Sequence, residues 1–146
     1  MYDSKVYTLS NGVKVIVKPT DHKADEIRMN AFSAGGNSLL PTEDVINMEV
    51  LGEVCELGGL GNFSSTDLMK VLSGKIVGVT PYVGSLEEGL RGTCSPKDLE
   101  TLLQLTYLMF TAPRMDDAAF ESYKNRAKIA LQNQELDPMS AFNDTL

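Results

Sequence analysis

The stretch from Tyr7 to Thr20, YTLSNGVKVIVKPT, predicts a β-hairpin. Its Asn11-Gly12 pair lies between two segments in which apolar and polar residues alternate, and this is the strongest short-range signal for a tight hairpin turn. We therefore expect antiparallel strands over Val6–Leu9 and Val13–Lys18.

A third strand and a helix should follow the hairpin. The segment IRMNAFSAGGNSLL begins at Ile27 and predicts a strand that runs into Gly35-Gly36. The segment TEDVINMEVLGEVCEL then predicts one continuous helix from Thr42 to Leu57, because apolar residues recur at helical spacing. Thr42 is suited to its N-cap, and Gly58-Gly59 is suited to its end.

A short helix and a second strand pair come next. Ser64 followed by Asp67 resembles a capping box for a helix over Ser65–Ser73. Strands are expected over Ile76–Gly84 and Glu88–Cys94, and Pro81 should place the first of them at a sheet edge or a bulge.

Two long helices complete the expected order. Ser95-Pro96 should begin the first, and Pro113 should end it. Its predicted buried face consists of Leu99, Leu102, Leu103, Thr106 and Phe110. Asp116 should cap the second, and Asp137-Pro138 predicts the start of a further helix that is interrupted at Leu146. The layout is α+β, with a mostly antiparallel sheet and helices packed on one face.

Length and charge limit the function classes. The 146 residues fit one domain, and a net charge of −7 argues against a nucleic-acid partner, which usually meets a basic patch. No apolar run approaches the roughly 20 residues of a membrane span, and the first residues show no signal-peptide pattern. Cys55 and Cys94 are expected as buried thiols, and a disulfide between them requires Cα atoms within about 7 Å.

Candidate chemical groups are few. A catalytic zinc site needs three protein ligands and an open position, whereas the only histidine, His22, lies in a polar stretch between two strands. Gly35-Gly36 and Gly58–Gly61 do not form a phosphate loop, and no nucleophile elbow is present. Glu87-Glu88 is expected in a polar hairpin loop. The basic residues Lys124, Arg126 and Lys128 are expected on the exposed side of a helix.

The order of these elements resembles the opening of a domain of the insulinase/pitrilysin-type zinc metallopeptidases. The segments that carry the resemblance are LSNGVKVIVKPT, AFSAGGNSLLP, the hairpin VTPYVG to EGLRGTCS with its following helix, and FESYKNRAKIALQNQELDP. In catalytic domains of that family, the helix after the glycines carries the inverted zinc motif H-x-x-E-H, and a later helix supplies a glutamate as third ligand.

This chain departs from the family pattern at each ligand position. The motif helix corresponds to Met48–Glu53, where Glu49 and Glu53 are the only acids and no histidine flanks them. The third-ligand segment corresponds to Ala127–Gln132, which has no carboxylate. We therefore expect no catalytic, cofactor-binding or metal-binding residue in this chain.

The resemblance implies that residues 1–146 form a single, C-terminally incomplete, non-catalytic domain of a zinc peptidase. It would form part of the substrate chamber and dock against a zinc-bearing half in the same polypeptide or a companion chain. The alternative is a scaffold or assembly subunit of the same fold without peptidase activity, and an unrelated α+β binding domain is a third reading. Bacterial relatives of this type are often periplasmic.

A truncated domain would leave apolar helix faces and sheet edges uncovered. We therefore also expect self-association, in the form of a homodimer through the surface that the absent elements would cover.

Overall fold

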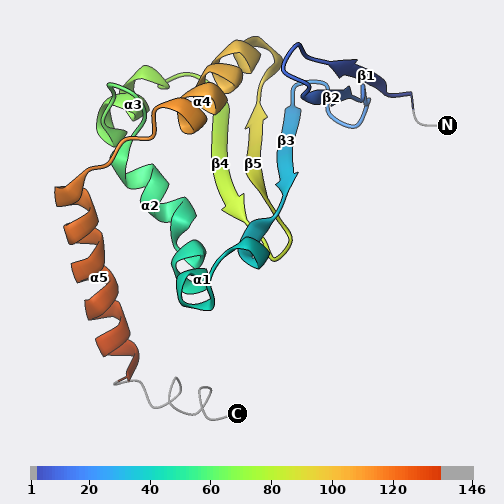
Figure 1. Cartoon of the computed structure of the whole chain (residues 1–146). Coiled ribbons are helices and arrows are strands. Elements are labelled where there is room, and N and C mark those ends of the chain that lie inside the picture. Colours follow the sequence, from blue (N-terminus) through green and yellow to red (C-terminus); the bar gives the residue numbers. More distant parts are fainter. Residues whose placement is uncertain (1–2, 136–146) are drawn as a thin grey trace.

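The computed structural model describes residues 3–135, and in this part of the chain the expected α+β architecture is present (Figure 1). A three-stranded antiparallel sheet has the order β3-β5-β4, and a separate hairpin pairs β1 with β2. The strands are β1 (Lys5–Thr8), β2 (Lys14–Val17), β3 (Ile27–Ala34), β4 (Val77–Val83) and β5 (Glu87–Cys94). The helices are η1 (Gly36–Leu39), α1 (Thr42–Glu49), α2 (Leu51–Gly58), α3 (Ser65–Val71), η2 (Pro96–Asp98), α4 (Leu99–Thr111) and α5 (Asp117–Glu135), where η marks a 3-10 helix.

The β1–β2 hairpin forms as its turn residues predict. Gly12 has a φ of 87°, and its amide donates to the Leu9 carbonyl at 2.9 Å. The Val13 amide donates to the Asn11 side-chain oxygen at 3.2 Å. The hairpin nevertheless forms its own two-stranded sheet and contributes little to the core, since Val13 and Val17 are exposed.

The register of the main sheet explains how Pro81 is accommodated. At the two ends of this strand pair, the Gly84 amide donates to the Glu87 carbonyl and the Ser95 amide donates to the Ile76 carbonyl. Because hydrogen-bonded pairs alternate along an antiparallel ladder, the odd-numbered residues of β5 form the backbone hydrogen bonds with β4. Leu90, opposite Pro81, is therefore in a non-hydrogen-bonded pair, and the missing amide hydrogen of the proline removes no ladder bond. The prediction of an edge strand is confirmed, because β4 lies at one side of the sheet.

The expectation of one continuous helix over Thr42–Leu57 is wrong. Thr42 is the first helical residue rather than the N-cap, and the helix is interrupted at Val50, which ends α1 with a φ of −100° and a ψ of 0°. A β-branched residue followed two positions later by Gly52 favours such a break. The break lets α2 pack against β4, where a β-carbon at Gly52 would lie 3.7 Å from the Pro81 carbonyl oxygen.

The hydrophobic core lies between the sheet and α4. Its buried members are Leu60, Val79, Leu90, Cys94, Leu102 and Leu105. The predicted buried face of α4 is only partly right: Leu102 is fully buried, whereas Leu103 is 53% exposed and Phe110 is 69% exposed. The helix is turned so that Leu105, which the sequence prediction omitted, enters the core instead.

Side-chain caps fix the helix starts. The Ser64 hydroxyl accepts from the Asp67 amide at 3.1 Å, which confirms the predicted capping box. The Asp116 carboxylate accepts from the Ala119 amide at 3.0 Å at the start of α5. Pro96 opens a 3-10 turn rather than the α-helix itself. The helix expected from Asp137-Pro138 lies outside the described residues.

No helix within residues 3–135 is long and apolar enough to cross a membrane.

Candidate functional site

A groove lies between α2 and α5, the two helices that run side by side at the left of Figure 1. Its volume is about 630 Å³. The residues that line it are Glu53, Glu56, Leu57, Ser65, Tyr123, Arg126, Ala127 and Ala130. Leu57 and the two alanines provide apolar surface, while the polar side chains provide two hydroxyl groups, a guanidinium and two carboxylates. Such a groove can bind polar groups of a ligand along an apolar surface.

Tyr123 on α5 and Glu53 on α2 meet across the groove. Hydrogen bonding to the Glu53 carboxylate, together with burial and the nearby negative charge, raises the pKa of Tyr123. A tyrosine hydroxyl can act as a donor at neutral pH. The sequence analysis did not single out Tyr123, so this pairing was missed.

Arg114 links the connection between α4 and α5 to the end of α2. Its guanidinium donates to the Gly58 carbonyl at 2.7 Å and to the Asp116 carboxylate at 3.2 Å. A β-carbon at Gly58 would lie 1.7 Å from the Arg114 carbonyl oxygen, so only glycine allows this approach. Gly58–Gly61 is thus a closely packed turn.

The groove brings together two carboxylates but no imidazole or thiolate. Structural and catalytic zinc sites use three or four imidazole, thiolate or carboxylate ligands in tetrahedral geometry. Within residues 3–135, no group of three or more His, Cys, Asp or Glu side chains is arranged to hold a metal ion. His22 is exposed in the connection between β2 and β3, and Glu26 in the same connection is engaged by Lys23 at 3.4 Å and Arg28 at 3.2 Å.

The two cysteines are free thiols. Cys94 is buried in the core and Cys55 is half-buried on α2, and burial raises the pKa of both. A raised pKa keeps a thiol protonated and therefore unreactive as a nucleophile. The expectation of two structural thiols is confirmed for Cys94 and holds in part for Cys55.

Glu88 has a structural role that the sequence analysis did not identify. Glu87-Glu88 was expected in a hairpin loop, but both residues belong to β5, and the turn precedes them. The Glu88 carboxylate accepts from the Ser33 hydroxyl at 2.5 Å and from the Gly36 amide, and these bonds lower its pKa. It thereby attaches the glycine pair at the end of β3 to the central strand.

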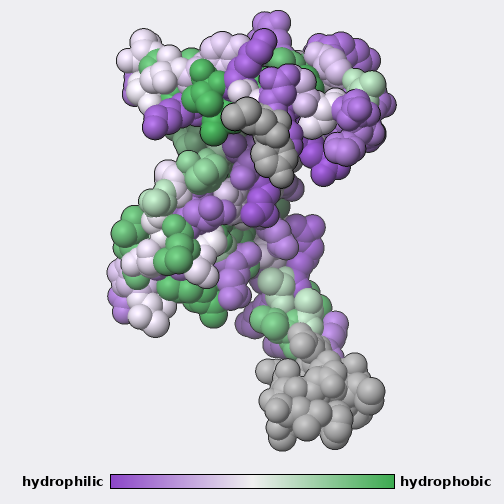
Figure 2. All heavy atoms as spheres, turned by 90° about the vertical axis from the view of Figure 1, so that its right-hand side faces the viewer, coloured by the Kyte–Doolittle hydropathy of each residue, from purple (hydrophilic) through white to green (hydrophobic). Residues whose placement is uncertain are grey.

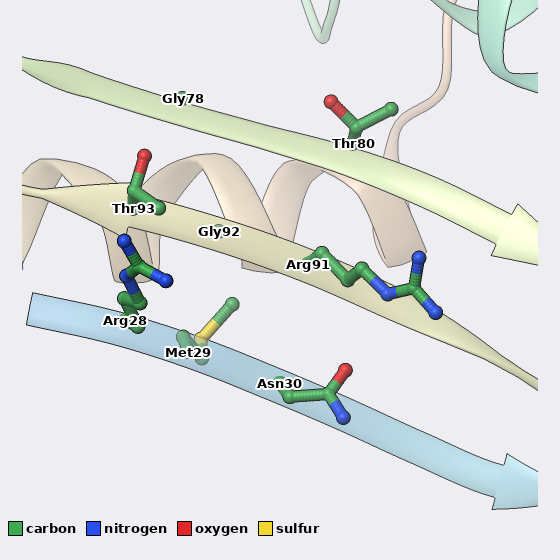
Figure 3. A pocket seen from close by; sticks show the side chains of 8 residues that line it. All are labelled: Arg28, Met29, Asn30, Gly78, Thr80, Arg91, Gly92 and Thr93. Atoms are coloured by element: carbon green, nitrogen blue, oxygen red, sulfur yellow. The ribbon is translucent and has the colours of Figure 1, made fainter.

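A second hollow, of about 530 Å³, lies on the sheet face opposite α4 (Figure 3). The labelled side chains come from all three strands, and α4 passes behind them in this view. Arg91 lies 4.0 Å above the centroid of the Tyr82 ring, and the Tyr82 hydroxyl donates to Glu87 at 3.1 Å. Because Arg28 is paired with Glu26, the charges on this face are largely matched, and it is a weaker site candidate than the groove.

The basic residues of α5 are exposed, as predicted. Lys124 pairs with Glu121 at 2.7 Å and lies 5.4 Å from the Phe120 ring centroid. Lys128 is also exposed, and of the three basic residues only Arg126 lines the groove.

Comparison with known proteins identifies relatives of the chain. Probable zinc protease PqqL from Haemophilus influenzae is 25% identical over 131 residues, which cover 90% of this chain and 14% of that protein. The chain is a homologue of zinc proteases of the PqqL type. Zinc protease PQQL-like from Arabidopsis thaliana is 28% identical over 138 residues, which cover 92% of this chain and 12% of that protein. No protein-family model matches the chain.

Solved structures of PqqL-type and other proteases share the fold. The periplasmic protease PqqL from Escherichia coli matches with a TM-score of 0.77 and 21% identity, over 97% of this chain and 16% of that chain. A mutant of the ferredoxin protease FusC, solved in complex with Arabidopsis ferredoxin, matches with a TM-score of 0.75 and 16% identity, over 97% and 16%. A protease from Helicobacter pylori matches with a TM-score of 0.66 and 14% identity, over 96% and 34%.

These relatives confirm the resemblance to insulinase/pitrilysin-type zinc peptidases and the fold class. The chain spans only 12–14% of the length of the curated PqqL-type relatives. Glu53, in the segment that the resemblance equates with the zinc motif, lines the same groove as Ala127 and Ala130, in the segment that it equates with the third-ligand helix. The break at Val50 divides the first segment, so Met48 and Glu49 belong to α1.

Proposed function

We propose that this chain is a non-catalytic segment of a larger zinc-dependent peptidase. In this proposal residues 1–146 form one peptidase-like domain without its own zinc. The domain provides part of the chamber wall for a peptide substrate and docks against a zinc-bearing half elsewhere in the parental protein.

The groove between α2 and α5 is the observation that carries the proposal. Three of its lining residues, Glu53, Ala127 and Ala130, belong to the two segments that the resemblance equates with the zinc-ligand positions of catalytic domains. Its polar side chains include no imidazole or thiolate, so they do not fit a zinc ligand set. In this proposal the groove contacts peptide and does not hold a metal ion.

The groove side chains suit peptide contact. Arg126 can donate to backbone carbonyls or carboxylates, Glu56 can accept from peptide amides, and Leu57 offers an apolar surface to a substrate side chain. A peptide bound there would be held by several weak contacts of this kind, as expected for a chamber wall that binds unfolded chains of varied sequence.

Kinetics of the parental protein test this function. Glu56→Gln and Arg126→Ala should raise KM for a peptide substrate by about 2–10-fold, since each removes one polar contact worth roughly 0.5–1.5 kcal/mol. The zinc content and kcat should stay unchanged. Lys128→Ala, exposed on α5 outside the groove, is the matched control and should leave KM unchanged.

Two results would contradict the proposal. A loss of bound zinc in Glu56→Gln would make the groove a metal site. A parental protein that neither binds zinc nor cleaves peptides would favour the alternative, a scaffold or assembly subunit of the same fold.

A further inference from the structure

One flank of α4 is apolar but uncovered. Leu99, Leu103, Thr106 and Phe110 are spaced by four, three and four residues, which places them on the same side of the helix. Leu99 is 38% exposed, Leu103 is 53% exposed and Phe110 is 69% exposed. A stripe of this pattern normally faces a protein interior, so a neighbouring element is missing from its side.

The uncovered flank of α4 faces the β3 side of the sheet. The hydroxyl of Thr106, a member of the stripe, donates to the Leu102 carbonyl at 2.8 Å and lies 3.9 Å from the Met29 sulfur on β3. The opposite flank contacts the connection after α2, where a β-carbon at Gly61 would lie 3.5 Å from Leu108. The stripe and β3 therefore belong to the same side of the molecule.

The outer edge of β3 is also without a strand partner in residues 3–135. The Gly35 amide donates to the carbonyl of Leu86, the residue just before β5. By the alternation of an antiparallel ladder, the odd-numbered residues of β3 therefore form the backbone hydrogen bonds with β5. The backbone N–H and C=O groups of Arg28, Asn30 and Phe32 consequently point away from the sheet. Figure 2 looks at the molecule from the side on which β3 lies in Figure 1, and hydrophobic surface is visible there between polar side chains.

We propose that a strand-and-helix unit of the parental polypeptide docks on this side. Its strand pairs with the outer edge of β3, and its amphipathic helix packs beside α4 against the stripe of Leu99, Leu103 and Phe110. The inference rests on the proposed function, because it takes the partner to be another segment of the larger peptidase.

Layer spacing favours this occupant over a second copy of the chain. The axes of packed helices lie about 8–10 Å apart, which is roughly twice the distance between neighbouring strands. A helix packed beside α4 would therefore lie above β3 and one strand added at its outer edge. α4 packs on β4 and β5. If two copies paired through β3, their α4 helices would lie roughly 14–24 Å apart, which leaves both stripes uncovered. A lone extended peptide would cover the strand edge but not the stripe.

Amide hydrogen exchange in the parental protein and in the 146-residue chain tests the proposal. The amides of Arg28, Asn30 and Phe32 should exchange roughly tenfold or more slowly in the parental protein than in the chain alone. The amides of Met29 and Ala31 bond to β5 in both and are the internal reference. Equal exchange at Arg28, Asn30 and Phe32 in the two proteins would overturn the proposal.

Substitution of the stripe provides a second readout. Leu103→Glu should lower the melting temperature of the parental protein while leaving that of the isolated chain unchanged, because Leu103 is already exposed in the chain. Leu86 lies in the turn between β4 and β5 and is 73% exposed. Leu86→Glu is therefore the matched control and should change neither melting temperature. An unchanged melting temperature for Leu103→Glu in the parental protein would contradict helix docking.

The oligomeric state separates the other occupants. A concentration-dependent dimer of the isolated chain that protects Arg28, Asn30 and Phe32 would assign the edge to a second copy and overturn the proposal. None of these measurements depends on zinc or on KM, so the docking proposal and the proposed function can fail independently.

Discussion

The Tyr123 hydroxyl on α5 donates a hydrogen bond to the Glu53 carboxylate on α2. This contact joins the two helices at the groove, about one turn from Arg126. It gives Glu53 a protein partner within the groove.

The first prediction concerns the pH dependence of this contact. The pKa of Tyr123 is raised above its ordinary value of 10.0, so the contact stabilises the fold fully below that pH. The stabilisation is lost as pH rises through the raised pKa. Tyr123→Phe should therefore be less stable than wild type at neutral pH, and the difference should shrink at alkaline pH. Urea unfolding from neutral pH to about pH 11 measures both, and a constant difference would argue against the bond.

A second prediction concerns Asp98, which is buried where β5 leads into α4. Its carboxylate accepts from the Ser95 hydroxyl at 2.7 Å and from the Ile76 amide at 2.9 Å, and these bonds lower its pKa. The ionised Asp98 carboxylate therefore stabilises the fold fully above the ordinary pKa of an aspartate, and this stabilisation is lost as the pH falls through the lowered pKa of Asp98. Asp98→Asn should lower the urea midpoint at neutral pH and flatten the acid limb of the profile.

Asp21→Asn, in the exposed connection between β2 and β3, is the control for Asp98 and should leave the neutral-pH midpoint unchanged. If Asp98→Asn and wild type lose stability in parallel below neutral pH, the buried carboxylate does not act as described.

A third prediction compares two adjacent leucines on α4. Leu102 has no exposed surface, whereas Leu103 is 53% exposed. Leu102→Ala should lower the free energy of unfolding by about 2–5 kcal/mol through lost burial and a cavity. Leu103→Ala should cost less than about 1 kcal/mol in the isolated chain. Similar losses in both variants, measured by urea denaturation, would mean that α4 is rotated from the orientation described.

A fourth prediction compares two glycines with positive φ. Gly36 has a φ of 60°, and a β-carbon there would lie 2.3 Å from the Gly84 carbonyl oxygen. Gly12 has a φ of 87°, and a β-carbon there would meet no atom within 4 Å. Gly12→Ala should cost about 1 kcal/mol of backbone strain, and Gly36→Ala about 2–4 kcal/mol because a steric clash is added. Equal losses would contradict the close packing of η1 on the β4–β5 turn.

Local signals in the sequence predicted the elements well. Asn11-Gly12, the capping box of Ser64 and Asp67, and Pro81 each act through the backbone of their own neighbours, and each is found as expected. The break at Val50 and the orientation of α4 were not predicted. Val50 and Gly52 favour a break locally, but whether the helix breaks there, and which face of α4 is buried, also depends on packing against β4 and β5.

The candidate site was less accessible from sequence. Residues of both segments that the resemblance equates with ligand positions line the groove, namely Glu53, Ala127 and Ala130. Single-sequence patterns could not show that Tyr123 meets Glu53, which lies 70 residues away in the chain. The predicted buried stripe of α4 is informative in the opposite way. Its apolar spacing was recognised, and its exposure in the structure indicates where another element should dock.

The most direct test of the central claim is the zinc content of the purified 146-residue chain, measured together with cleavage of a fluorogenic peptide before and after chelation. We predict no stoichiometric zinc after dialysis and no chelator-sensitive cleavage. One tightly bound zinc per chain, with cleavage that a chelator abolishes, would show that this chain carries an active site and would contradict the account.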